Sequence, residues 1–243
     1  MTGEHDLEHN HQPEQIAARL SDGPKANYLR DWIYGGIDGA VTTFAIVAGV
    51  VGADLSNRVV LILGMANLLA DGFSMAAANY SGTKAELDDY SRIRRMEERH
   101  IKVVPEGERE EIRQLFAAKG FAGEDLTRAV EVITSSEQRW VDMMVAEEHG
   151  IPAVDRSPIL AGLMTFFAFL VCGLVPLLPF LGGVAASVSL SVLMTALVFF
   201  IIGSLKSRWS TSSWWRSGTE TLAIGLTAAG VAYAVGFALK DFA

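Results

Sequence analysis

Five long apolar runs constrain the fold of this 243-residue chain more than any other feature of its sequence. They cover residues 33–53, 59–80, 159–181, 184–205 and 219–239. Each run reaches the roughly 20 residues that an α-helix needs to cross the hydrocarbon core of a bilayer. Half of the chain is hydrophobic and a fifth is charged, totals that a soluble protein with long core helices could also show. Because the apolar residues are clustered, we predict an all-α integral membrane protein with five transmembrane helices.

The basic residues predict how these helices are oriented. With five crossings, 18 of the 20 Lys and Arg residues fall in the segments on one side of the membrane, and two fall on the other. Positive residues near the ends of membrane helices favour the cytoplasmic side. We therefore expect the N-terminus and the long second connection to be cytoplasmic, and the C-terminus to lie on the opposite side.

Residues 1–30 are expected to form a polar N-terminal tail. This tail lacks the basic region, apolar stretch and cleavage site of a signal peptide. Its residues 14–20 are weakly amphipathic, as in a short helix that lies on a membrane surface. We interpret His5, His9 and His11 as solvated residues without a metal-binding role. The membrane helices form two groups, 31–80 and 157–243, on either side of residues 81–156.

Residues 81–156 are predicted to form a helical domain of three helices between the second and third membrane helices. The first helix continues without a breaker from the second apolar run to about residue 103. Pro105, with Glu106 and Glu108 behind it, is typical of a helix N-terminus, and this second helix is expected to end near Gly120. The third helix is expected at about 125–149.

Metal-type ligands recur at helical spacing in this insertion. Side chains three or four residues apart project from one helix face, so packed helices can bring such pairs together around divalent cations. The candidate ligands are Glu97, His100, Glu108, Glu111, Met143, Met144 and Glu147. Carboxylates suit ions such as Fe2+ and Mn2+, and a thioether adds a softer preference. The alternative is a solvated acidic face whose glutamates only complement helix dipoles.

Polar residues also interrupt the first two apolar runs. In the second run one helix face carries Asn67, Asp71 and Ser74, together with the thioether of Met75. Asp38 and Thr42 form a similar stripe in the first run. An Asp at the bilayer centre costs roughly 3 kcal/mol, so it usually faces a water-filled route or a bound ion. We interpret the six residues as lining an ion route; the alternative is that the aspartates pair with backbone or Tyr groups.

Taken together, these features resemble the vacuolar iron transporter family, which includes bacterial and nodulin-like proteins. The resemblance rests on DGAVTTFAIVAG at 38–49, LLADGFSMAAANY at 68–80, the acidic insertion and the five runs, and it covers residues 28–243. It implies a homodimer with the ion route between the two copies of the first helix. It also implies a cytoplasmic metal-binding domain and export of Fe2+ or Mn2+ from the cytoplasm in exchange for protons.

The resemblance also assigns roles to individual positions. Asp38 and Met75 match the family's intramembrane carboxylate and thioether, and the glutamates and methionines of the insertion match its cytoplasmic ligands. Two positions depart from the pattern, because Asn67 and His100 each stand where many members carry a glutamate. Asn67 offers a carbonyl oxygen but no titratable proton, and Asp71, one turn further on, is our candidate substitute.

Two alternatives to a metal/proton exchanger stay open. One is a passive divalent-cation channel, which Asn67 favours, and the other is a metal-responsive membrane sensor or store that does not transport. An enzyme is not expected, because the membrane runs hold no His and the sequence has no Ser-His or HExxH arrangement. We expect no permanent cofactor and no nucleic-acid partner, only the bilayer, the transported metal and protons. In a bacterium the membrane would be the inner membrane.

Overall fold

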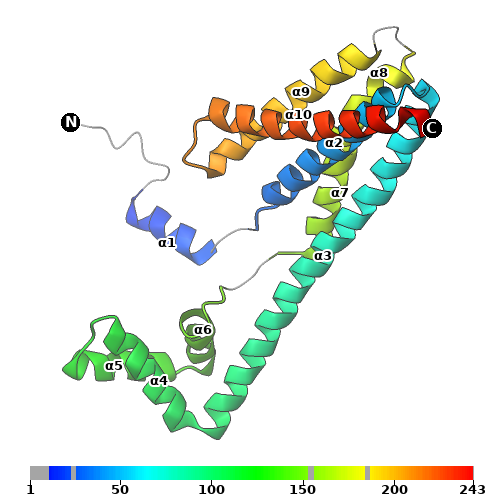
Figure 1. Ribbon diagram of the computed structural model, residues 1–243. Coiled ribbons are helices and arrows are strands. Elements are labelled where there is room, and N and C mark those ends of the chain that lie inside the picture. Colours follow the sequence, from blue (N-terminus) through cyan, green and yellow to red (C-terminus); the bar gives the residue numbers. More distant parts are fainter. Residues whose placement is uncertain (1–10, 23–25, 153–155, 184–186, 243) are drawn as a thin grey trace, which may run out of the picture.

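The computed structural model describes residues 11–22, 26–152, 156–183 and 187–242. Within these ranges every regular element is helical, and no strand is present. Figure 1 shows a bundle of long helices and a smaller group of short helices, joined by one helix that belongs to both. The predicted all-α class is therefore confirmed.

Five helices are long and apolar enough to cross a membrane, as the sequence predicted. They are α2 (Leu29–Gly52), α3 (Asn57–Val103), α7 (Pro158–Leu174), α9 (Ser187–Lys206) and α10 (Trp214–Leu239). A 3-10 turn, Val175–Leu177, and the short helix α8 (Leu178–Leu181) extend α7. The 3-10 turns Ser207–Trp209 and Lys240–Phe242 extend α9 and α10.

Helix α2 lies at the centre of the bundle and contacts the other four long helices. Its glycines allow neighbouring backbones to approach closely. A Cβ atom on Gly39 would lie 2.4 Å from the carbonyl oxygen of Phe169 in α7. On the α10 side, a Cβ atom on Gly236 would lie 2.0 Å from the carbonyl oxygen of Gly49. The small-residue faces of α2 therefore serve helix packing within the chain.

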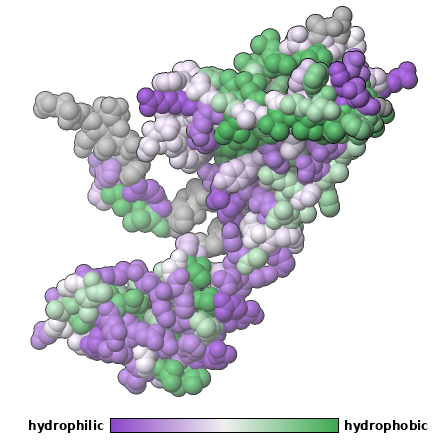
Figure 2. Space-filling view, viewed as in Figure 1, coloured by the Kyte–Doolittle hydropathy of each residue, from purple (hydrophilic) through white to green (hydrophobic). Residues whose placement is uncertain are grey.

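Helix α3 is 47 residues long and extends far beyond the bundle (Figure 1). Against its distal part pack α4 (Pro105–Ala118) and α6 (Glu137–Glu147), and α5 (Gly123–Thr134) packs in turn on α4 and α6. These helices share an apolar core that includes Ile101, Ile112, Trp140 and Met144. We call this unit the helical domain. Figure 2 shows its largely hydrophilic surface beside the apolar surface of the bundle.

The boundaries of α3 and α4 agree with the sequence, but the single helix expected at 125–149 is wrong. The stretch contains α5 and α6, which are separated at two serines. The hydroxyl of Ser135 donates to the carbonyl oxygen of Val132 at 2.8 Å and accepts from Arg139 at 2.9 Å. Ser136 is extended, with φ −134° and ψ 120°. Serine side chains compete for backbone hydrogen bonds in this way, and hydrophobic periodicity does not reveal it.

The N-terminal tail contains helix α1 (Pro13–Asp22), which spans the short helix expected at 14–20. Its Leu20 side chain is 72% exposed, so this apolar residue does not pack on the bundle. His5 and His9 lie outside the described residues.

Candidate metal centre and ion route

A pair of buried glutamates lies where α3, α4 and the end of α6 meet. Glu97, on α3, is only 1% exposed, and its Oε1 lies 2.9 Å from Nε2 of His149. Glu108, in the first turn of α4, is 3% exposed, and its Oε1 lies 3.5 Å from Nδ1 of His100. The Oε2 atoms of both glutamates are buried and have no hydrogen-bond partner among the described residues. Such orphaned oxygens are costly in a folded protein unless a bound cation, or a proton shared between the two carboxyl groups, satisfies them.

The charges around Glu108 have a clear electrostatic consequence. Burial, followed by the negative charges of Glu111, Glu97 and Glu148, raises the pKa of Glu108 to about 7. Burial and the charge of Glu111 also raise the pKa of Glu148. Carboxylates crowded in this way repel one another, and a divalent cation would relieve the repulsion.

The ligand atoms form two groups of three that share one residue. Glu97, His100 and Glu108 form the first group, and Glu97, Glu148 and His149 form the second. Within each group the ligand atoms all lie within 4.8 Å of one another. Glu97 can therefore contribute to two neighbouring cation positions. The mixed set of carboxylate oxygens and imidazole nitrogens suits borderline divalent ions of the first transition row.

Three of the seven ligands predicted in the insertion, Glu97, His100 and Glu108, lie in these groups. A fourth, Glu111, lies close enough for its charge to raise the pKa of Glu108. The other three have different surroundings. Met144 is fully buried in the core of the helical domain, and Met143 packs against the same core. Glu147 pairs with Lys119, with 2.6 Å between Nζ and Oε2.

Sequence reasoning missed Glu148 and His149. Both follow the last residue of α6, so the spacing of three or four residues that marks a helix face no longer applies to them. Gly150, with φ 65°, turns the chain immediately afterwards. An adjacent Glu and His before a glycine at a helix end was the signal available in the sequence.

The residues predicted to line an ion route lie on α2 and α3 in the bundle. Thr42 donates to the carbonyl oxygen of Asp38 at 2.8 Å, and the side-chain amide of Asn67 donates to the Thr42 hydroxyl at 3.5 Å. Asp71 is close enough to Asp38 for their charges to interact. These four residues and Met75 are partly buried, whereas Ser74 is exposed on the same side of α3. The two stripes predicted from the sequence therefore form one polar seam, which we call the α2–α3 seam.

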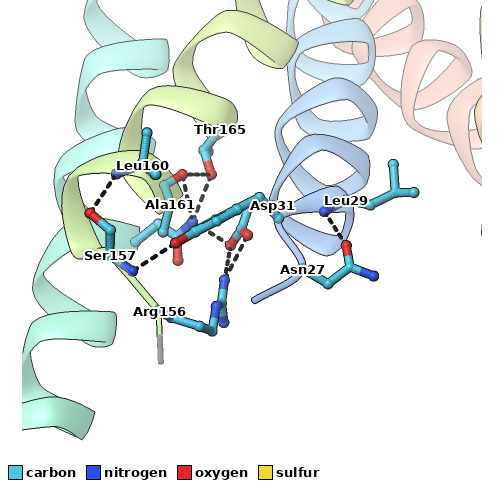
Figure 3. Close-up of polar contacts among 10 residues, drawn as sticks. Asn27, Leu29, Asp31, Arg156, Ser157, Leu160, Ala161 and Thr165 are labelled. Atoms are coloured by element: carbon cyan, nitrogen blue, oxygen red, sulfur yellow. Dashed lines mark hydrogen bonds and ion pairs between the residues drawn. The ribbon is translucent and has the colours of Figure 1, made fainter. Parts of the chain in front are cut away.

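A buried ion pair lies where the helical domain joins the bundle. Asp31, near the start of α2, is 3% exposed. Its Oδ1 and Oδ2 accept from Nη2 of Arg156 at 2.8 and 2.6 Å (Figure 3). The amide of Asn79 on α3 donates to Asp31 at 2.8 Å and to the hydroxyl of Thr165 on α7 at 2.7 Å. Ser157 donates its backbone N–H to the Tyr28 hydroxyl at 2.7 Å. Arg156 was considered from the sequence only as a basic residue near a membrane end, and no residue of this cluster was predicted to bind an ion.

Comparison with known proteins decides the family. The model of the VIT family matches residues 29–237. The chain belongs to the VIT family. A protein named vacuolar iron transporter from Toxoplasma gondii is 35% identical over 227 residues, which cover 88% of this chain and 75% of that protein. Vacuolar iron transporter 1 of Arabidopsis thaliana is 33% identical over 208 residues, covering 84% of this chain and 83% of the relative. The rice protein of the same name is 31% identical over 237 residues, which cover 96% of this chain and 91% of that protein.

The VIT-family match spans both the bundle and the helical domain, from the start of α2 into α10. It confirms the resemblance found in the sequence. Five long apolar helices in a chain of this family identify a multi-pass membrane protein.

Proposed function

We propose that this chain transports divalent Fe2+, Mn2+ or both out of the cytoplasm, in exchange for protons. The observation that carries the proposal is the buried pair Glu97 and Glu108, each with an unpartnered carboxylate oxygen. Glu97 lies on α3, the helix that also carries one side of the polar seam in the bundle, and Glu108 lies in the first turn of the next helix, α4. The names of the relatives, vacuolar iron transporters, support iron as a cargo.

The helical domain would collect the ion first. Its carboxylates provide a negative field that concentrates cations, and a bound ion remains exchangeable because each group offers only three ligands, not all of them buried. The excess of basic residues in the segments on this side of the bundle supports a cytoplasmic location for the domain. The ion then passes to the α2–α3 seam, where Met75 and Asp38 are the proposed ligands.

The seam itself supports a homodimer. In the single chain Ser74 is exposed and Asp71 is only partly buried, although both lie within a candidate membrane span. Lipid contact with such groups is unfavourable, so a second copy is the proposed cover. Protonation of Asp38 or Asp71 from the opposite compartment would weaken metal binding and release the ion.

A passive divalent-cation channel is the second candidate, and one contact favours it. Asn67 donates to the Thr42 hydroxyl within the seam, and an amide at this position cannot carry a proton through the transport cycle. In that case Asp71 would be a ligand only, and metal flux would not be linked to proton flux.

Proteoliposomes separate these candidates. Uptake of Fe2+ and Mn2+ is measured at zero membrane potential with a pH-sensitive dye inside the vesicles. Proton movement opposite to the metal supports the exchanger, and metal flux without proton movement supports the channel. Absence of flux would contradict transport and favour a sensor or store. Asp38→Asn should abolish metal-driven proton movement, whereas Asp88→Asn, on an exposed face of α3, should not.

A further inference from the structure

The polar residues of α2 and α3 meet at three successive levels of the bundle. Asp31 contacts Asn79, Asp38 interacts with Asp71, and Thr42 contacts Asn67. Successive levels are seven and then four residues apart along α2, and eight and then four residues apart along α3, which runs in the opposite direction. The Asp31 level is therefore the first that an ion from the helical domain would meet. It lies about 10 Å along the helix axis from Asp38, at 1.5 Å per residue.

This first level has the composition of a cation site. Both carboxylate oxygens of Asp31 face it, and the Thr165 hydroxyl and the Ala161 carbonyl oxygen lie within 2.7 and 3.2 Å of the Asn79 amide nitrogen. Rotation of that amide by half a turn would present its oxygen as well. Carboxylate, hydroxyl and carbonyl oxygens are the ligands that hard divalent cations prefer. The cation at this site in the structure is the guanidinium of Arg156.

The guanidinium of Arg156 uses only part of its hydrogen-bonding capacity in this ion pair. A single nitrogen, Nη2, makes both contacts with Asp31, and the buried Nε has no partner among the residues described. Arg156 lies outside the helices, two residues before α7 begins, so its backbone is not fixed by a helical ladder. Its Cζ lies 5.7 Å from the ring centroid of Tyr28, and this ring can hold the guanidinium by a cation–π contact when it leaves the carboxylate.

We propose that Asp31 is a divalent-cation site at the domain-side entrance of the α2–α3 seam, and that Arg156 occupies it as a tethered cation until a metal ion displaces it. The proposal rests on the transport function proposed above. While Arg156 occupies the site, the carboxylate of Asp31 is not available to other cations. Arg156 lies on the connection between the helical domain and α7. A metal ion that displaces Arg156 from Asp31 would therefore also release this connection from α2.

The test measures Mn2+ uptake by proteoliposomes containing the full chain with Arg156→Ala. If Arg156 occupies the site about nine-tenths of the time, removing it should lower the KM for Mn2+ about tenfold, because apparent affinity scales with the competent fraction. The turnover at saturating Mn2+ should stay unchanged. Arg156→Lys, which retains the positive charge, should lower the KM by a smaller factor. Arg216→Ala, which removes an exposed arginine at the start of α10, is the matched control and should leave the KM unchanged.

Free guanidinium distinguishes an entrance site from a purely structural ion pair, because the two interpretations predict opposite effects of guanidinium on Mn2+ transport by the Arg156→Ala variant. In Arg156→Ala vesicles, guanidinium should compete with Mn2+ and raise its KM, and it should have little effect on the parent protein. If Arg156 only held the helices together, guanidinium would restore transport that the substitution had lost.

The outcomes separate the two proposals. A parent protein that carries no Mn2+ would refute the transport function and this inference with it. A parent that transports, combined with an Arg156→Ala variant whose KM is unchanged or whose rate is restored by guanidinium, would refute the entrance site alone. If Arg156→Ala does not fold, Arg156→Lys carries the test through its KM.

Discussion

Replacing Glu108 by Gln should stabilise the metal-free helical domain at neutral and alkaline pH. The pKa of Glu108 rises from 4.5 to about 7 because the side chain is buried beside Glu111 and Glu97. A carboxyl whose pKa is higher in the folded state binds its proton more tightly there. Its stabilising contribution is therefore complete below pH 4.5 and is lost as the pH rises to about 7.

The magnitude follows from the size of the shift. A difference of about 2.5 pH units corresponds to about 3 kcal/mol between the protonated and ionised forms. The metal-free parent domain should lose roughly this much stability between pH 4.5 and pH 8. Gln has the shape of the protonated acid and cannot ionise, so Glu108→Gln should recover most of the loss at pH 8. It should change little at pH 4.5.

Hydrogen exchange of the backbone amides in α4 and α6 measures this local stability directly. The protein is kept in chelator, and each rate is normalised to the intrinsic rate at the same pH. Glu106→Gln is the matched control, because Glu106 lies on the same helix with its side chain 83% exposed and paired with Arg109. Protection in the parent that stays constant or increases with pH would refute the reasoning. So would a control that behaves like Glu108→Gln.

Three further substitutions test the metal centre and the bundle. His149→Ala should weaken Mn2+ binding to the purified full-length protein at least about tenfold by calorimetry, because it removes a nitrogen ligand from the group that shares Glu97. Met144→Leu should leave Mn2+ affinity unchanged and cost less than about 1.5 kcal/mol by thermal unfolding, because Met144 is a core residue. Gly39→Ala should lower the thermal stability of the bundle by more than about 1 kcal/mol, because its Cβ would overlap the Phe169 carbonyl oxygen; an unchanged melting temperature would contradict the close packing of α2 and α7.

The sequence was most informative where one physical constraint dominates. A bilayer requires about 20 apolar residues per helix, so the five membrane helices could be located by length and clustering alone. The uninterrupted α3 was predictable because no Pro occurs between 57 and 103, and Pro105 marks the start of α4. The break between α5 and α6 was not predictable from periodicity, because the side chain of Ser135 replaces backbone hydrogen bonds there.

The metal-type residues show a different limit. Spacing on a helix identifies residues that share a face, but tertiary packing decides which face meets the core. Glu97 and Glu108 face each other across two helices, whereas Met144 faces the core of the same domain. The pair of Asp31 and Arg156 was beyond sequence reasoning, because the two residues are 125 positions apart and meet only when α2 and α7 pack together.

The continuity of α3 gives the last prediction. One additional Ala after Gly82, which has open space around its Cβ position, would rotate everything beyond it by about 100° relative to the bundle. The core of the helical domain, with the metal-type ligands around it, lies entirely beyond this point, so Mn2+ binding by the domain should survive. If transfer of the ion depends on how the domain is oriented on α3, transport should fall, because the ligands of the domain would be rotated by about 100° relative to the entrance at Asp31. The measurement compares Mn2+ binding with Mn2+ uptake in the same preparation. Uptake that survives the rotation would show that the domain acts only by raising the local cation concentration, and that its orientation on α3 is irrelevant.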